Sequence, residues 1–203
     1  MRAVDVAIPE VPQAPYPIFC SEFNEVINGF GRGSSELGIP TANIDIDKLP
    51  SIINDDLSLG VYFGYCQLME NDALNINNNG TETSSNIKFR EDGSEVIYNY
   101  GAQLNASNGD LEKLPVVLSV GKNPFYNNEQ DVDAIQKTVE LHILHDFESD
   151  FYGALIKFNI LGYIRPELNY TSKEQLIDDI NTDIEIARST LLKPTYLKYK
   201  DLL

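Results

Sequence analysis

A segment rich in glycine and hydroxyl side chains is the densest group of residues in this sequence that could do chemistry. It reads NGFGRGSSELGIPTANID over residues 28–45. Alternating glycines let the backbone approach a ligand closely and point successive N–H groups at phosphate oxygens. The segment lacks the Lys of a Walker A motif and the spacing of a dinucleotide-binding fingerprint, so on its own it also fits a structural turn. The candidate phosphate-binding residues are Gly29, Gly31, Gly33, Ser34 and Ser35.

The sequence Pro-Thr-Ala-Asn at residues 40–43 brings two neutral oxygen ligands directly after this loop. Thr41 and Asn43 are two positions apart, so on an extended backbone their side chains point to the same side. Mg²⁺ takes few protein ligands beside substrate phosphates and waters, and a hydroxyl and an amide oxygen suit it. The pair therefore predicts a site for nucleotide-bound Mg²⁺, although the same residues could simply cap a turn.

An acidic residue among apolar ones occurs in KTVELHILH at residues 137–145. If this segment is a strand, Glu140 and His142 share the face opposite its apolar residues. A carboxylate turned toward a barrel interior is costly unless it has a partner or a task, so we predict that Glu140 is a general base. His142 and His145 are more often structural, and two histidines alone make a weak metal site.

The sequence GYIRPE at residues 162–167 ends the last predicted strand. The planar guanidinium of Arg165 can stack on a ring or bind an oxyanion, and Pro166 stops the strand beside it. An ordinary surface ion pair between Arg165 and Glu167 is the alternative interpretation.

The composition favours a globular and strongly acidic protein. The chain has 203 residues, 42% of them hydrophobic, with 31 acidic and 15 basic side chains and a net charge of −16. An acidic surface repels phosphate backbones and anionic lipid heads, so we expect no nucleic-acid partner, and no run is long enough for a membrane span. Cys20 and Cys66 are expected to be buried free thiols. The N-terminus lacks a signal-peptide pattern, so we expect a cytoplasmic protein, with mitochondrial or other organellar association left open.

Short apolar segments separated by turn residues predict a mainly β fold. Residues 1–17 contain four prolines and are expected to form an extended arm, followed by a single domain over residues 18–203. Closure of a small sheet removes its exposed edges, so we predict a six-stranded antiparallel barrel. The predicted strands are Ile18–Ile27, Gly60–Met69, Val96–Leu104, Val116–Val120, Thr138–His145 and Ala154–Ile164.

A polar segment of low complexity, from about residue 70 to 113, interrupts the strand pattern. We call it the insertion. It is predicted to be a long hairpin whose tip, at residues 71–86, has too few apolar residues to offset the entropy of ordering. We expect the insertion to lie away from the site, so that its removal changes activity little.

Helical periodicity predicts one C-terminal helix at about residues 171–192. Thr171 and Glu174 have the spacing of a capping box, and Lys193-Pro194 is expected to end the helix. Its apolar face should pack on the barrel, while its charged residues should face solvent.

Together these segments resemble riboflavin kinase, which phosphorylates the ribityl 5′-hydroxyl of riboflavin to give FMN. The matches occur in the family's order over roughly residues 18–192. They are GFGRGSSELGIPTAN at 29–43, GVYFGY at 60–65, LSVGKNPFY at 118–126, TVELHILH at 138–145, DFYG at 150–153 and GYIRPE at 162–167. The resemblance implies a Greek-key barrel. It also implies an enzyme of the eukaryotic monofunctional type, because too few residues precede the barrel for the adenylyltransferase domain of bacterial members.

The resemblance also implies roles for individual residues. The glycine-rich loop and Thr41 would bind the phosphates of ATP, and Thr41 with Asn43 would hold Mg²⁺. Glu140 would be the catalytic acid–base residue. Flavin contacts would fall on Ile143, His145 and Arg165. We therefore expect a monomeric kinase that converts riboflavin and ATP to FMN and ADP.

Three other functions are compatible with parts of the sequence. A non-catalytic barrel that binds flavin or nucleotide would need a cavity, but neither a reactive carboxylate nor a metal turn. An interaction module would display the acidic insertion to a partner. A kinase for another small alcohol would use the same motifs.

Overall fold

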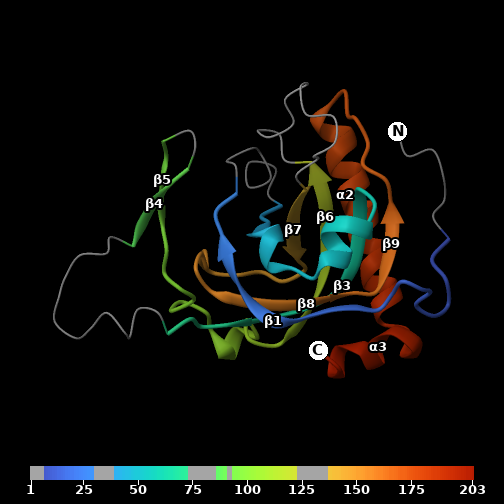
Figure 1. Cartoon of the computed structure of the whole chain (residues 1–203), viewed down its shortest axis with the longest axis horizontal. Coiled ribbons are helices and arrows are strands. Elements are labelled where there is room, and N and C mark those ends of the chain that lie inside the picture. The colour runs from blue at the N-terminus through green and yellow to red at the C-terminus, as the bar shows by residue number, and fades with distance from the viewer. Residues whose placement is uncertain (1–6, 30–38, 73–85, 91–92, 123–136) are drawn as a thin grey trace.

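A closed barrel forms the centre of the computed structural model, which describes residues 7–29, 39–72, 86–90, 93–122 and 137–203. Around the ring the strands follow the order β1, β2, β7, β6, β3, β8, and the pairing of β6 with β3 closes it (Figure 1). Every neighbouring pair is antiparallel. The predicted mainly β, six-stranded antiparallel barrel is confirmed. Its strands are β1 (Ile18–Ile27), β2 (Ala42–Ile44), β3 (Gly60–Met69), β6 (Lys113–Lys122), β7 (Lys137–Ile143) and β8 (Leu155–Ile160).

A short strand, β9 (Gly162–Arg165), continues β8 along the same edge of β3. Cys66 pairs with Phe158 of β8, whereas Val61 pairs with Arg165 of β9. Together, β8 and β9 account for the strand predicted at Ala154–Ile164. The continuation matters for function because it brings Arg165 beside the barrel wall.

The apolar residues form two layers on either side of the barrel wall. The inner layer fills the barrel and includes Tyr62, Cys66 and Leu118. The outer layer includes Phe63 and Tyr65 and packs under the C-terminal helices. Strand β3 is therefore buried on both faces, which explains its nearly continuous run of apolar residues. Cys20 and Cys66 are buried free thiols, as predicted.

One of the six predicted strands is wrong. Within Val96–Leu104, only the start belongs to a strand, β5 (Glu95–Ile97), which pairs with β4 (Ile87–Phe89) in a separate two-stranded sheet. The chain then turns at Tyr100 and Gly101, whose φ angles are 56° and 83°. The strand missing from the prediction is β2, which has only three residues and therefore shows no clear alternation. Short turns of 3-10 or π helix occur at Ile46–Lys48, Ile52–Asp56 and Ala106–Asn108.

Two C-terminal helices, α2 (Lys173–Leu191) and α3 (Pro194–Asp201), follow the barrel where one was predicted. Ser172 rather than Thr171 caps α2, with its side chain accepting a hydrogen bond from the Gln175 N–H. Pro194 does not simply stop α2, because it occupies the first turn of α3, where no N–H donor is needed. Neither described helix has the length and hydropathy needed to cross a bilayer.

The N-terminal residues 7–17 contain neither helix nor strand and run against α3. The hydroxyl of Tyr196 donates to the carbonyl of Pro9, and the hydroxyl of Thr195 donates to that of Glu10.

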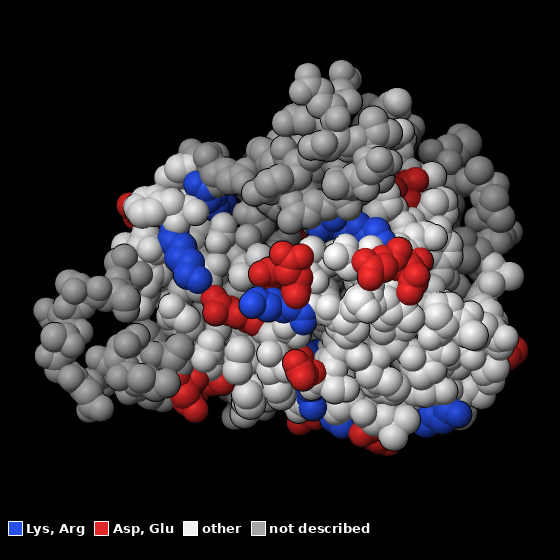
Figure 2. Space-filling model, in the orientation of Figure 1, with Lys and Arg blue, Asp and Glu red and all other residues white. Residues whose placement is uncertain are grey.

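On the face shown in Figure 2, acidic and basic side chains lie interspersed rather than in one continuous acidic patch.

Candidate active site

A cavity of about 520 Å³ lies between the outer face of the barrel wall and α2. Much of its wall is apolar and comes from both the barrel and α2, through Val61, Val117, Leu168, Leu176 and Ile180. A polar strip lines the rest and includes Thr41, Ser119, Glu140, Arg165 and Glu167. The cavity thus places an apolar surface beside a group of hydroxyl, carboxylate and guanidinium side chains.

Strand register explains why the polar residues meet. Across neighbouring strands, Asn43 pairs with Glu140, Glu140 with Ser119, Ser119 with Val61, and Val61 with Arg165. Residues in register project to the same face of a sheet, so this row crosses the outer surface of the barrel. Five strands far apart in sequence therefore contribute to one site.

Glu140 lies on the outer face of the barrel wall, so the prediction that it faces the barrel interior is wrong. Its neighbours Val139, Leu141 and Ile143 fill the barrel, so Glu140 projects outward into the cavity rather than into the barrel interior. The cost of burial still applies, because α2 and the loop that precedes it cover this part of the wall. Burial raises the pKa of Glu140, although a hydrogen bond from Thr41 opposes this effect.

Thr41 is the immediate partner of this carboxylate. Its Oγ1 donates a hydrogen bond to Oε2 of Glu140 over 3.1 Å. Nearby, Nδ1 of His142 lies 2.9 Å from the Pro40 carbonyl oxygen, to which it can donate only as an N–H. Burial lowers the pKa of His142, which favours its neutral form. Contacts from the side chains of Thr41 and His142 therefore join the Pro-Thr-Ala-Asn segment to β7, in addition to the pairing of β2 with β7.

Arg165 is held by a buried ion pair. Its Nε and Nη2 atoms each lie 2.8 Å from Oδ2 of Asp183 on α2, and Nη1 donates to the Pro166 carbonyl. The predicted alternative, a surface pair between Arg165 and Glu167, is wrong. Asp183 has an exposed fraction of 1% and Asp179 one of 7%, so the prediction that the charges of this helix face solvent is wrong at both positions.

The metal-binding residues proposed from the sequence lie at one end of the polar strip. Gly29 packs against Asn43 so closely that a Cβ atom at Gly29 would lie 2.6 Å from the Asn43 Nδ2. No group of three or more His, Cys, Asp or Glu residues that could hold a metal occurs in the described part of the chain. One hydroxyl and one amide fit an ion that receives its other ligands from phosphates and water, as Mg²⁺ does. Gly31, Gly33, Ser34 and Ser35 lie outside the described residues.

Comparisons with known proteins identify the family. The family model for riboflavin kinases, Flavokinase, matches residues 15–191. The chain is 58% identical over 193 residues to the riboflavin kinase of Candida glabrata, covering 94% of this chain and 92% of the relative. It is 53% identical over 202 residues to that of Saccharomyces cerevisiae, covering 100% of this chain and 85% of the relative. The chain belongs to the riboflavin kinase family.

A solved structure of a riboflavin kinase supports the fold assignment. The enzyme from Trypanosoma brucei is 25% identical to this chain, with a TM-score of 0.54. The likeness covers 93% of this chain and 88% of that one. The family assignment makes the chain a kinase and excludes the non-catalytic barrel as its function.

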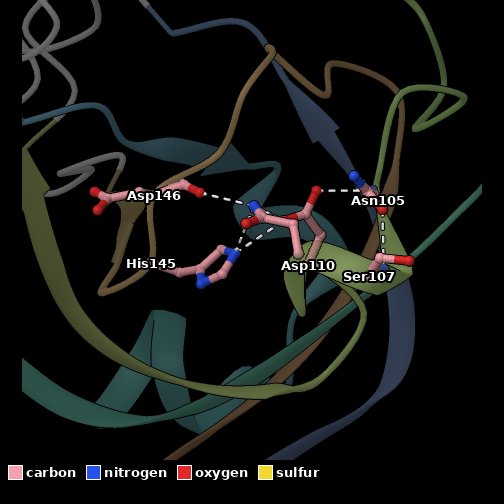
Figure 3. A network of polar contacts seen from close by, with 6 residues as sticks. Asn105, Ser107, Asp110, His145 and Asp146 are labelled. Atoms are coloured by element: carbon pink, nitrogen blue, oxygen red, sulfur yellow. Dashed lines mark hydrogen bonds and ion pairs between the residues drawn. The ribbon is translucent and has the colours of Figure 1, made fainter.

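Two residues that the resemblance assigns to the flavin of riboflavin kinases lie away from the cavity. Ile143 has an exposed fraction of 5% and packs inside the barrel. His145 turns toward the insertion, where its Nε2 lies 2.8 Å from Oδ1 of Asp110 (Figure 3). Arg165, the third such residue, lines the cavity. Flavin contact by Ile143 and His145 stays a prediction without support from this geometry.

Among the acidic residues of the cavity, Asp183 was missed by the sequence analysis, and Glu167 was considered only as a surface partner of Arg165. Asp183 follows Leu176 and Ile180 along the inward face of α2, so helical spacing could have placed it there. Glu167 lies against Gly121, where a Cβ atom would come within 2.8 Å of its carboxylate. Burial raises the pKa of Glu167, with a further upward contribution from Glu140 that Lys122 and Arg165 oppose. No local pattern marks Glu167 because its position depends on the loop after β9.

Proposed function

We propose that riboflavin binds in the cavity between the barrel and α2, and that Glu140 accepts the proton of its ribityl 5′-hydroxyl. The family assignment supplies the reaction, which converts riboflavin and ATP to FMN and ADP. The observation that carries the assignment of roles is the position of Glu140 on the polar strip, facing an apolar wall. The apolar wall suits the isoalloxazine ring, and the polar strip suits the ribityl chain and the phosphates.

Glu140 has the electrostatic character of a general base. Its carboxylate is partly desolvated and receives one hydrogen bond, from Thr41. A raised pKa strengthens a carboxylate as a proton acceptor near neutral pH. In the proposed step, the proton of the 5′-hydroxyl moves to Glu140 as the hydroxyl oxygen bonds to the γ-phosphorus. The bond from that phosphorus to the bridging oxygen breaks, and ADP leaves.

Thr41 and Asn43 would hold Mg²⁺ together with the phosphates of ATP. Such an ion neutralises negative charge that develops on the phosphoryl oxygens. The hydroxyl of Thr41 touches Glu140, so the proposed metal site and the proposed base adjoin each other. The glycine-rich residues beyond Gly29 are proposed to supply backbone N–H groups to the same phosphates.

Arg165 is proposed to face the flavin or its new phosphate. Its guanidinium is fixed by Asp183 on one side, so it needs little reorganisation to act as a donor. Among the cavity residues that the structure describes, Arg165 and Lys173 are cationic, whereas Glu140, Glu167 and Asp183 are acidic. Because carboxylates outnumber cations, binding of ATP at this site is proposed to depend on the metal.

We also propose that the enzyme is monomeric and cytoplasmic.

An assay of Glu140→Gln tests the role of the base. The variant should bind riboflavin with unchanged affinity but form FMN at least about 100-fold more slowly, the lower range for loss of a general base. FMN is measured by chromatography and riboflavin binding by titration calorimetry. Glu185→Gln, on an exposed part of α2, is the matched control and should retain full activity. Turnover near that of the wild type in Glu140→Gln would remove Glu140 from the role.

A further inference from the structure

Tyr98 belongs to the insertion, yet it is completely buried, with an exposed fraction of 0%. Its hydroxyl donates a hydrogen bond to Oδ1 of Asn28 over 2.7 Å and accepts one from the Asn28 backbone N–H over 2.9 Å. Burial raises the pKa of Tyr98, so the hydroxyl keeps its proton at neutral pH. One side chain of the insertion therefore holds both the backbone and the side chain of Asn28.

Asn28 is the residue through which the chain passes from β1 to the glycine-rich loop. Its predecessor Ile27 pairs with Asn43 at the end of β1. Its successor Gly29 lies against the Asn43 side chain so closely that no Cβ atom would fit. Displacement of Asn28 would therefore move Ile27 and Gly29, which lie beside Asn43.

The ring of Tyr98 is itself held on several sides. The Lys88 Nζ lies 3.8 Å from the ring centroid and forms an ion pair of 3.0 Å with Glu25 of β1. The Tyr152 ring packs against it with centroids 5.8 Å apart. These contacts fix the hydroxyl relative to β1, so Tyr98 can set the position of Asn28 rather than follow it.

We propose that Tyr98 is a positioning residue for the nucleotide site and acts through Asn28 and Gly29 on the amide of Asn43. This inference rests on the proposed role of Asn43 in holding the metal and ATP. It goes beyond that role because it makes part of the insertion necessary for nucleotide affinity. At this residue the proposal departs from the expectation that the insertion lies away from the site.

The test is Tyr98→Phe, which keeps the buried ring and removes only the hydroxyl. The KM for MgATP should rise about fivefold to tenfold, as expected for the loss of about one net hydrogen bond. The KM for riboflavin should stay within about twofold, because neither Tyr98 nor Asn28 is among the residues that line its proposed cavity. Tyr100→Phe is the matched control, since it removes a hydroxyl from the same aromatic group without changing the contact with Asn28.

The KM values separate positioning from general stabilisation. A loss of stability alone would lower the active fraction without selectively raising the KM for MgATP. An unchanged KM for MgATP in Tyr98→Phe, an equal rise for both substrates, or the same rise in Tyr100→Phe would overturn the inference. Asn43→Ala is measured in parallel and should raise the requirement for Mg²⁺ and ATP together. If Asn43→Ala leaves that requirement unchanged, both the metal role of Asn43 and the inference about Tyr98 fail.

Discussion

Burial of the Glu140 carboxylate suits it to act as the proposed base but makes the folded state less stable. Burial raises its pKa above the ordinary value of 4.5, because the fold disfavours the ionised form. A group with a raised pKa in the folded state contributes stability at low pH, and this contribution is lost as the pH rises through the folded pKa. The charge that Glu140 needs for its proposed role as a base is thus a destabilising feature at neutral pH.

The stability of Glu140→Gln should therefore exceed that of the wild type at neutral pH. An amide resembles the protonated acid in shape and has no charge to desolvate. We expect its unfolding midpoint to lie about 2 °C higher at pH 7.5 and the difference to vanish below about pH 4. Thermal unfolding followed by circular dichroism across this range measures both quantities. A midpoint below that of the wild type at pH 7.5 would contradict the assigned pKa direction.

Individual site residues could be predicted where local periodicity decided their orientation. Strand alternation separated Glu140 from its apolar neighbours, and a spacing of two placed Thr41 and Asn43 on one side. The covered surface that Glu140 faces could not be predicted, because α2 supplies the cover from about 40 residues away in sequence. Tyr98 was missed for the same reason, since its contact with Asn28 spans 70 positions.

At the scale of elements, α2 serves as both a wall and an anchor for the cavity. Its Leu176 and Ile180 contribute apolar surface, and Asp183 holds Arg165 of β9. The helix also supplies Ala187 and Leu191 to the outer apolar layer over β3. Packing of α2 on the barrel and the geometry of the site are therefore coupled.

Asp183→Asn should disrupt this coupling. Removal of one partner from a buried ion pair leaves the other charge uncompensated and costs about 3 kcal/mol or more. We expect a comparable loss in the free energy of unfolding, measured by urea denaturation, and a higher KM for riboflavin because Arg165 loses its fixed position. Glu185→Gln, on an exposed part of the same helix, should change neither quantity. Unfolding and riboflavin KM like those of the wild type would show that the pair has no such role.

Element boundaries were predictable where the residue pattern was long. The bounds of β1 and β3 agree with the prediction at both ends, because each strand has ten residues bounded by turn residues. The three residues of β2 could not be distinguished from a turn. Conversely, Val96 and Tyr98 alternate like strand residues because both are buried, but β5 ends at Ile97 and pairs with β4, outside the barrel.

For the whole molecule, the net charge of −16 is compatible with an anionic substrate for two reasons, the distribution of the charges and the proposed metal ion. Acidic and basic side chains are interspersed on the face in Figure 2. Among the described residues, three carboxylates and two cations line the cavity itself. A divalent cation would reverse this local excess, so metal and nucleotide should bind as a unit.

Several contacts join the insertion to the barrel and its loops. Tyr98 binds Asn28 after β1, whereas Asp110 binds His145 after β7 (Figure 3). Burial alone would raise the pKa of Asp110, but hydrogen bonds from Asn105, His145 and Asn108 outweigh it and lower the pKa. The ionised form is therefore favoured by the fold, and its contribution to stability is lost as the pH falls through the lowered pKa. Tyr98 and Asp110 therefore both link the described part of the insertion to loops at the ends of barrel strands.

Replacement of residues 72–110 by a Gly-Ser linker of about six residues tests this integration at the scale of the molecule. A short linker can close the gap because Gln67 and Lys113 are paired in neighbouring strands. The residues proposed for catalysis remain, so FMN formation should persist. The unfolding midpoint should fall by about 4 °C or more, and the KM for MgATP should rise at least as much as in Tyr98→Phe. Full stability with an unchanged KM for MgATP would instead show that the insertion is a dispensable addition to the barrel.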